Sequence, residues 1–363
     1  YQSTQQDFPR VVDFQVQVAQ LQSDDPQEKL EWKDVDKAFA SACLKAAEKA
    51  WGAAERYPAL FASPESVGGG PYDDKHVEDE FYWAAAELFI TTKKPQYKKF
   101  LAASPYYLKL PPRLPESPEG GGIASPMTWQ EVAALGTISL AIVPNALGEP
   151  ALKMAREAIK DAADTYVEIL QKRGYRIPLD YGKAGKAPWG SNSFLLNNLI
   201  VLGLAYDLYG NKTYLDAVAA GMDYILGRNA MDQSYVTGYG SRPLRNPHHR
   251  FWAHQANDKY PPPPPGAVSG GPNSGLDDPY VKSVGLPGCA PEKCFADNIG
   301  SWTTNEVTIN WNAPLAWAAA FLDEKGGGPQ KVQPAAPARQ SKGQPGNKTY
   351  KTETKTKHAP GMQ

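Results

Sequence analysis

Apolar residues recur at three- and four-residue steps over several long segments, which is the spacing of an α-helix with one buried face. The segments with this pattern, or with an apolar run of helical length, are 34–56, 77–92, 128–143, 150–173, 192–209, 212–226 and 311–323. No segment shows the sustained two-residue alternation of strands that hairpin turns join. The sequence therefore predicts an all-α protein.

The predicted helices alternate between two kinds of surface. Residues 192–209 are apolar almost all round, which is typical of a helix buried on most sides, and Gly210 ends this segment. Residues 150–173 carry charge on one face and apolar side chains on the other, as an outer helix does, and we expect Gly174 to end that helix. Helical hairpins stacked in two layers account for this alternation.

Two segments lack the helical pattern. Residues 227–310 are turn-rich and include PPPPP and SGGPNSGLDDP, and a loop region of this length in a compact domain is usually functional or disordered. Their His, Arg, Asp and Tyr content favours function. Residues 326–363 are rich in Pro, Lys and Thr, so we expect a disordered tail, either a linker to a further module or a plain extension. Residues 1–325 then form the folded domain.

The composition argues against two classes of partner. The chain has 363 residues and a formal net charge of -1, which favours neither nucleic acid nor an anionic membrane as a main partner. No window approaches the roughly 18 apolar residues of a membrane span. Nine Trp and 19 Tyr are many for this length, and aromatic faces that do not fill the core can stack on sugars.

The three cysteines leave the redox chemistry open. Cys289 and Cys294 lie five positions apart in the loop-like stretch CAPEKC, where a disulfide is one option that spacing alone cannot establish. No histidine stands at zinc-finger spacing from them, so isolated thiols, Cys43 among them, are favoured over a metal site.

Two stretches concentrate the candidate chemistry. SYVTGYGSRPLRNPHHR (234–250) gathers Tyr239, His248 and Arg250, whose side chains can donate to hydroxyls or orient a carboxylate. FADNIGSWTTNEVTINWNAP (295–314) places Asp297 and Glu306 near tryptophans. Two acids near aromatic rings suit glycoside hydrolysis, because an apolar wall raises the pKa of the carboxyl that must donate a proton. By residue type alone, a capping Asp297 and a solvated Glu306 are equally good interpretations.

These two stretches resemble the signature regions of glycoside hydrolase family 9, the inverting cellulases with an (α/α)6 barrel. In the first, the matching positions are Ser234, Val236, Thr237, Gly240, Arg242, Pro247, His248 and Arg250. In the second, they are Phe295, Asp297, Trp302, Glu306, Thr308, Asn312 and Ala313. GGGPYDDKHVEDEFYWAAAELF and PWGSNSFLLNN also resemble this family, so the resemblance covers roughly residues 38–325. It is strongest with the branch of large cellulosomal cellobiohydrolases and endoglucanases.

The resemblance implies roles for individual side chains. Glu306 matches the catalytic acid, Asp297 the acid that supports the site, and His248 a residue near the scissile bond. The substrate-binding residues expected in the same way are Arg250, Trp189, Trp311, Tyr72, Tyr239 and Trp302. The implied substrate is cellulose or cello-oligosaccharides, and an insoluble substrate in turn implies a secreted protein.

The resemblance also bears on metal. No cofactor is required for the reaction, but Asp79 and Glu80 match ligands of a structural Ca²⁺ in some members. A further acid at that site is not evident, since Gln130 and Glu131 follow Trp129.

One departure from the family pattern concerns the general base. The family draws it from an Asp-Ala-Gly-Asp motif far upstream of the acid, and this motif is absent from the chain. We expect it to fall before Tyr1, together with the first helices of the six-hairpin toroid, so the chain alone should hydrolyse cellulose poorly or not at all. The alternatives are a non-catalytic glucan-binding module, a structural α/α toroid that binds a protein, and a same-family glycosidase acting on mixed-linkage or glucosamine-containing glycans.

Overall fold

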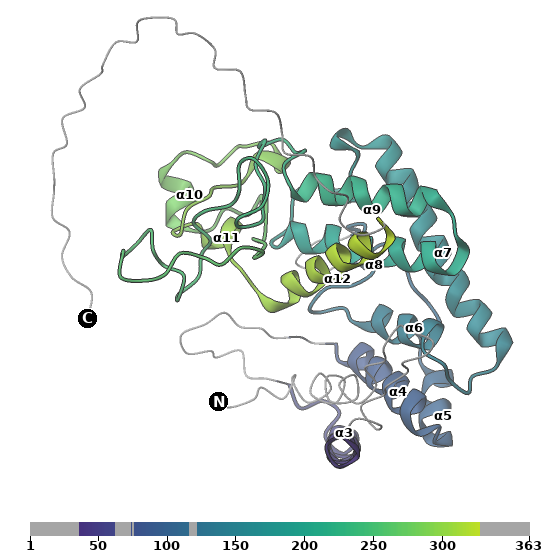
Figure 1. Ribbon diagram of the computed structural model, residues 1–363. Helices are drawn as coiled ribbons and strands as arrows, with labels where there is room; N and C mark the ends of the chain where they lie inside the picture. The colour runs from purple at the N-terminus through teal and green to yellow at the C-terminus, as the bar shows by residue number, and fades with distance from the viewer. Residues whose placement is uncertain (1–35, 62–73, 75, 116–121, 327–363) are drawn as a thin grey trace, which may run out of the picture.

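The computed structural model describes residues 36–61, 74, 76–115 and 122–326 and confirms the all-α prediction (Figure 1). The long helices are α3 (Lys37–Arg56), α4 (Glu78–Thr92), α5 (Pro95–Ala103), α6 (Ala133–Ile142), α7 (Glu149–Lys172), α8 (Ser191–Tyr209), α9 (Lys212–Ile225) and α12 (Ile309–Lys325). Short helical turns are η1 (Gly174–Arg176), α10 (Pro279–Ser283), η2 (Pro291–Lys293) and α11 (Trp302–Asn305). Within the described ranges, β-pairing is limited to isolated bridges.

Helix α8 is the centre of the helical array. It packs against α7, α9 and α12, while α4 packs against α5 and α6, and α6 against α7. Most residues of α8 and α4 are buried, whereas α7 and α9 bury one face each. The predicted alternation of buried and amphipathic helices is therefore confirmed. None of the described helices is long and apolar enough to cross a membrane.

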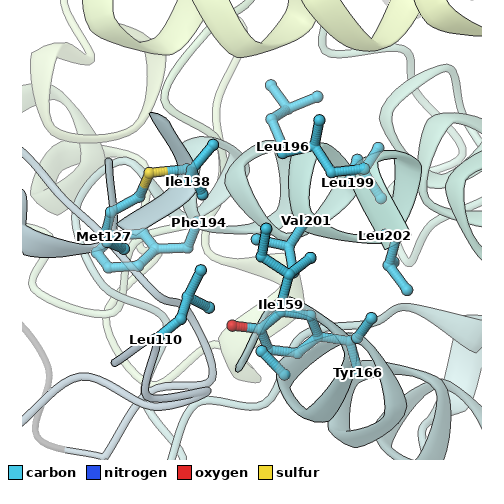
Figure 2. Packing of buried hydrophobic residues seen from close by; sticks show 14 of the residues in the cluster. Leu110, Met127, Ile138, Ile159, Tyr166, Phe194, Leu196, Leu199, Val201 and Leu202 are labelled. Atoms are coloured by element: carbon cyan, nitrogen blue, oxygen red, sulfur yellow. The ribbon is translucent and has the colours of Figure 1, made fainter. Parts of the chain in front are cut away.

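The core is continuous through these helices. Figure 2 shows Ile159 and Tyr166 of α7 pointing toward Val201 of α8, and Phe194 near Met127. Small residues allow the helices to approach closely. A Cβ built on Gly203 of α8 would lie 2.7 Å from the ring of Trp317 on α12, so no larger side chain fits there without a shift.

Two helix ends differ from the expectations. Helix α7 ends at Lys172 because Arg173 is already extended, and the left-handed conformations follow at Tyr175 and Arg176 instead of Gly174. The guanidinium of Arg173 pairs with Glu292, which holds this residue outside the helix. Helix α6 begins only at Ala133, after a turn.

Helix α5 (Pro95–Ala103) was not predicted. It buries only Tyr97 and Leu101, so its apolar pattern is too short to recognise. Helices α8 and α9 end beside Gly210 and Gly227, as predicted from the sequence.

The irregular segment 227–308 lies beside the helical array and carries α10 and α11 (Figure 1). A second, small core gathers Leu276, Val281 and Cys294. Cys289 and Cys294 form a disulfide, which settles the question that their spacing left open, and Cys43 is a free, buried thiol. The predicted tail lies outside the described residues apart from Gly326.

Candidate active site

Glu306 stands at the junction between α11 and α12. It is the extended residue that ends α11, and α12 begins three positions later at Ile309. Its backbone is fixed by neighbours from distant parts of the chain. The N–H of Gly270 donates to the carbonyl oxygen of Glu306 at 2.9 Å, and the N–H of His248 donates to the carbonyl of Asn305 at 2.8 Å. His248 and Glu306 thereby form an isolated parallel bridge.

The carboxyl group of Glu306 is half-buried against an indole. Trp189 Nε1 donates to Glu306 Oε2 at 3.1 Å, and the rings of Trp189 and Trp302 lie 5.5 Å apart between centroids, with their planes tilted by 33°. Burial raises the pKa of Glu306 above its usual value, although the Trp189 hydrogen bond and the charge of His248 act in the opposite direction. A carboxyl in this environment keeps a proton to higher pH, as a general acid must.

The ring of His248 is oriented by a backbone carbonyl. Its Nδ1 donates to the carbonyl oxygen of Ile299 at 2.5 Å, which leaves Nε2 for another partner. The neighbouring ring of His249 stacks on Trp252 at 4.0 Å between centroids, and burial followed by the charge of His248 lowers the pKa of His249. The two histidines therefore differ in their surroundings. His248 lies near Glu306, whereas His249 packs against Trp252.

Asp297 anchors the loop that leads to His248. Its carboxylate accepts the backbone N–H groups of Arg245 at 2.9 Å and Asn246 at 2.7 Å, together with Gln233 Nε2 at 3.1 Å. Asn305 binds the same loop, because its Nδ2 donates to the carbonyl of Asn246 at 2.6 Å. These contacts make Asp297 an anchor of the loop that carries His248, and its sequence-based assignment as the acid that supports the site stays a prediction.

The sequence model of Glycosyl hydrolase family 9 matches residues 27–319. The chain belongs to this family. The match begins upstream of residue 38, the start that the resemblance of the motifs predicts. The helices have the arrangement of the family's (α/α)6 barrel, in agreement with the predicted fold class.

Relatives in family 9 are similar over most of this chain. A cellulose 1,4-beta-cellobiosidase of Acetivibrio thermocellus is 50% identical over 303 residues, covering 81% of the chain and 34% of that protein. Endoglucanase C of Cellulomonas fimi is 40% identical over 295 residues, covering 80% of the chain and 26% of the relative. The structure of a metagenome-derived family 9 endoglucanase superposes with a TM-score of 0.69 at 30% identity. The match covers 88% of this chain and 52% of that endoglucanase. The chain thus spans about half or less of each of these proteins.

The predicted substrate-binding residues of this family 9 chain separate into three groups. Trp189 donates to Glu306, and the ring of Trp302 lies against that of Trp189. Tyr239 is 56% exposed and Arg250 is also exposed, so both are accessible to a ligand. Trp311 is only 7% exposed, and its indole packs against the backbone of Gly190 and Gly270. Trp311 therefore has a packing role in the described structure, and its expected role as a sugar platform stays a prediction. Tyr72 lies outside the described residues.

The resemblance predicts Asp79 and Glu80 as Ca²⁺ ligands, but the described residues do not gather a set of ligands around them. Asp79 and Glu80 are both buried in the first turn of α4, and Asp79 Oδ2 accepts the N–H of Val132 at 2.7 Å at the start of α6. No three His, Cys, Asp or Glu residues within the described ranges form a group that could hold a metal ion. Asp79 acts as a cap for α6, and its expected role as a Ca²⁺ ligand stays a prediction.

Sequence reasoning missed the segment that joins the two signature regions. The backbone of Gly270 donates to Glu306 and accepts the N–H of Asn192 at 2.9 Å, so it connects the acid to the start of α8, directly after Trp189. The only available signal was the Gly-Gly-Pro run at 270–272, because such runs mark close backbone approach.

Proposed function

We propose that this chain provides the general-acid side of a cellulase site that hydrolyses β-1,4-glucosidic bonds with inversion. The observation that carries the proposal is the half-buried carboxyl of Glu306, held by Trp189 and raised in pKa. Trp189 engages Oε2, and Oε1 has no hydrogen-bond partner among the described residues. Glu306 can therefore present a protonated oxygen to the leaving group while its orientation stays fixed.

The remaining residues supply positioning and contact. His248 Nε2 and the exposed Arg250 guanidinium are suited to hydroxyl oxygens, and the rings of Trp189 and Trp302 to the face of a glucose unit. Inversion requires a second carboxylate, roughly 6.5–9.5 Å from the acid, to activate water. We assign that role to an aspartate from an upstream Asp-Ala-Gly-Asp motif, which this chain lacks.

The substrate proposal is cellulose or cello-oligosaccharides outside the cell. It is supported by relatives described as a cellobiosidase and an endoglucanase. A relative from Bacteroides ovatus, 32% identical, is described as specific for xyloglucan, so a decorated β-1,4-glucan is the competing substrate.

A second candidate function is glucan binding without hydrolysis. One observation favours it: in the described part of the chain, the only charged group acting on the pKa of Glu306 is His248, and no second carboxylate is involved. Retention on cellulose without product release would support this alternative.

Turnover and binding can be tested separately. For turnover, the upstream segment of the Acetivibrio thermocellus relative would be fused to the N-terminus of this chain. Proton NMR would then follow the release of soluble sugar from cellopentaose and identify the anomer formed. Glu306→Gln in this fusion should lower turnover at least 100-fold, because a positioned general acid contributes about 10²–10⁴-fold. Calorimetry should show that it still binds cellopentaose.

The 363-residue chain alone serves as the second arm. It should bind cellopentaose and release little or no product. Near-normal turnover by the Glu306→Gln fusion would refute the assignment of the acid, and robust α-cellobiose release by the chain alone would mean that it contains its own base.

A further inference from the structure

Helix α11, which carries Glu306 at its end, is too short to be stable alone. It spans only Trp302–Asn305, and isolated helices shorter than about 12 residues are marginal in water. Its N-cap residue, Ser301, makes no side-chain capping bond, since its hydroxyl lies against Thr304 Oγ1 at 2.7 Å. The position of α11 must therefore be fixed by groups outside the helix.

A buried carboxylate supplies this support. Asp278 is 0% exposed, and its Oδ2 accepts both the backbone N–H of Thr303, at 3.1 Å, and the Thr303 hydroxyl. Its Oδ1 accepts the N–H of Val281 at 2.8 Å and so caps α10. Within the described ranges Asp278 has no cationic partner, so the N-terminal N–H groups of two short helices and one hydroxyl stabilise its charge.

Asp278 is itself held within a small lobe, residues 276–294, which we call the Asp278 lobe. The small core around Val281 and the Cys289–Cys294 disulfide close this lobe on itself. Glu292 ties it to the end of α7 through Arg173, with 3.0 Å between Oε1 and Nη2. The backbone position of Asp278 is therefore fixed, so its carboxylate can hold α11 in place.

The carbonyl groups of α11 are bound by the loop residues that directly precede the Asp278 lobe. Asn273 Nδ2 donates to the carbonyl of Thr303 at 2.9 Å, and the N–H of Gly271 donates to the carbonyl of Thr304 at 3.0 Å. The N–H, hydroxyl and carbonyl of Thr303 are thus all bound by residues 273–278. Any rotation of α11 would break these bonds together.

We propose that Asp278 is a positioning residue, which caps α11 from the Asp278 lobe and thereby sets the direction in which Glu306 meets Trp189. Its relevance to catalysis rests on the proposed function of Glu306 as the acid. The geometric effect on the hydrogen bond between Trp189 and Glu306 does not depend on turnover.

The test follows the indole N–H of Trp189 in the full 363-residue chain. Its cross-peak in a ¹⁵N–¹H spectrum is assigned with Trp189→Phe, and Glu306→Ala defines the position of this indole without its carboxylate acceptor. Asp278→Asn, which keeps the shape but places an amide against two donors, should move the cross-peak toward the Glu306→Ala position. Thr303→Val should move it in the same direction by less, and Thr303→Ser, which keeps the hydroxyl, should restore it.

Glu87→Gln is the matched control. Glu87 is also a fully buried carboxyl, but it lies in α4, where it accepts from Trp83 Nε1 and Ser139 Oγ. This change lies away from α11 and should leave the Trp189 cross-peak in place, whatever its effect on the melting temperature. The proposal is overturned if Asp278→Asn and Thr303→Val only lower the melting temperature, or if Glu87→Gln moves the cross-peak as far. A failure of the proposed function would appear instead as normal turnover by Glu306→Gln, whatever the spectra show.

Discussion

The two oxygens of Glu306 have different surroundings, and this difference makes the role of Trp189 testable. The indole N–H binds Oε2 and opposes the effect of burial on the pKa of Glu306. Trp189→Phe removes the donor while keeping an aromatic ring beside Trp302, so the pKa of Glu306 should rise further. A ¹³C-carboxyl NMR titration, assigned with Glu306→Gln, measures this pKa.

Trp252→Phe is the control for that titration, because Trp252 stacks on His249 and makes no described contact with Glu306. It should leave the pKa of Glu306 where it is in the unmodified chain. An unchanged or lowered pKa in Trp189→Phe would mean that the indole does not stabilise the ionised carboxylate.

Asp297 should matter to stability more than an ordinary surface acid does. Asp297→Ala leaves the N–H groups of Arg245 and Asn246 without their acceptor, so the free energy of unfolding should fall by about 2 kcal/mol in urea titrations. Glu157→Ala removes an acid that is 53% exposed and paired with Lys153 on α7, and should change the free energy of unfolding by less than ~0.5 kcal/mol. Equal effects of the two changes would show that Asp297 does not anchor the loop.

At the scale of elements, the contact between α4 and α6 contains a buried acid. Burial raises the pKa of Glu87 to about 7 from its usual 4.5, against the hydrogen bonds from Ser139 and Trp83. Because folding raises this pKa, the unfolded chain releases the proton first as the pH increases. The folded state should therefore lose about 3 kcal/mol of stability from this group between pH 4.5 and pH 7.

Glu87→Gln should remove that part of the pH dependence. Urea unfolding of both chains at several values between pH 4.5 and pH 7 gives the difference. The pKa of Glu131 is also raised to about 7, by burial and then by Asp79 and Asp74, but this contribution is common to both chains and cancels. Parallel pH profiles for the two chains would contradict a buried, protonated Glu87.

The elements also show how far sequence pattern reaches. Helix α8 was predicted almost to the residue, because it is long, apolar all round and followed by Gly210 in the left-handed conformation. Helix α5 was missed because two buried residues in nine give no clear period. The burial of Trp311 could not be predicted either, since it depends on glycines from two other segments approaching its ring.

For the whole molecule, the sequence singled out Glu306 as the candidate acid but did not show the arrangement that holds it. Glu306 and His248 were recognisable as parts of two motifs, because their side chains define the motifs. Their connection is made by backbone groups of Asn305 and Gly270, and its only mark in the sequence is the Gly-Gly-Pro run at 270–272. The capping of α11 by Asp278 was equally hidden, since an Asp-Pro pair reads as an ordinary start of a local helix.

The backbone connections around α11 have a consequence for chain length. Because Gly270, Gly271 and His248 bind through main-chain atoms, these bonds depend on where the backbone lies along the chain. Adding one residue between 268 and 274, or between 297 and 306, would instead shift every donor past its acceptor. A scan with single-glycine insertions should find these two stretches intolerant and the exposed turn at 284–288 tolerant, with soluble yield and melting temperature as the readout. In this part of the molecule, the number of residues in each loop is constrained as well as their type.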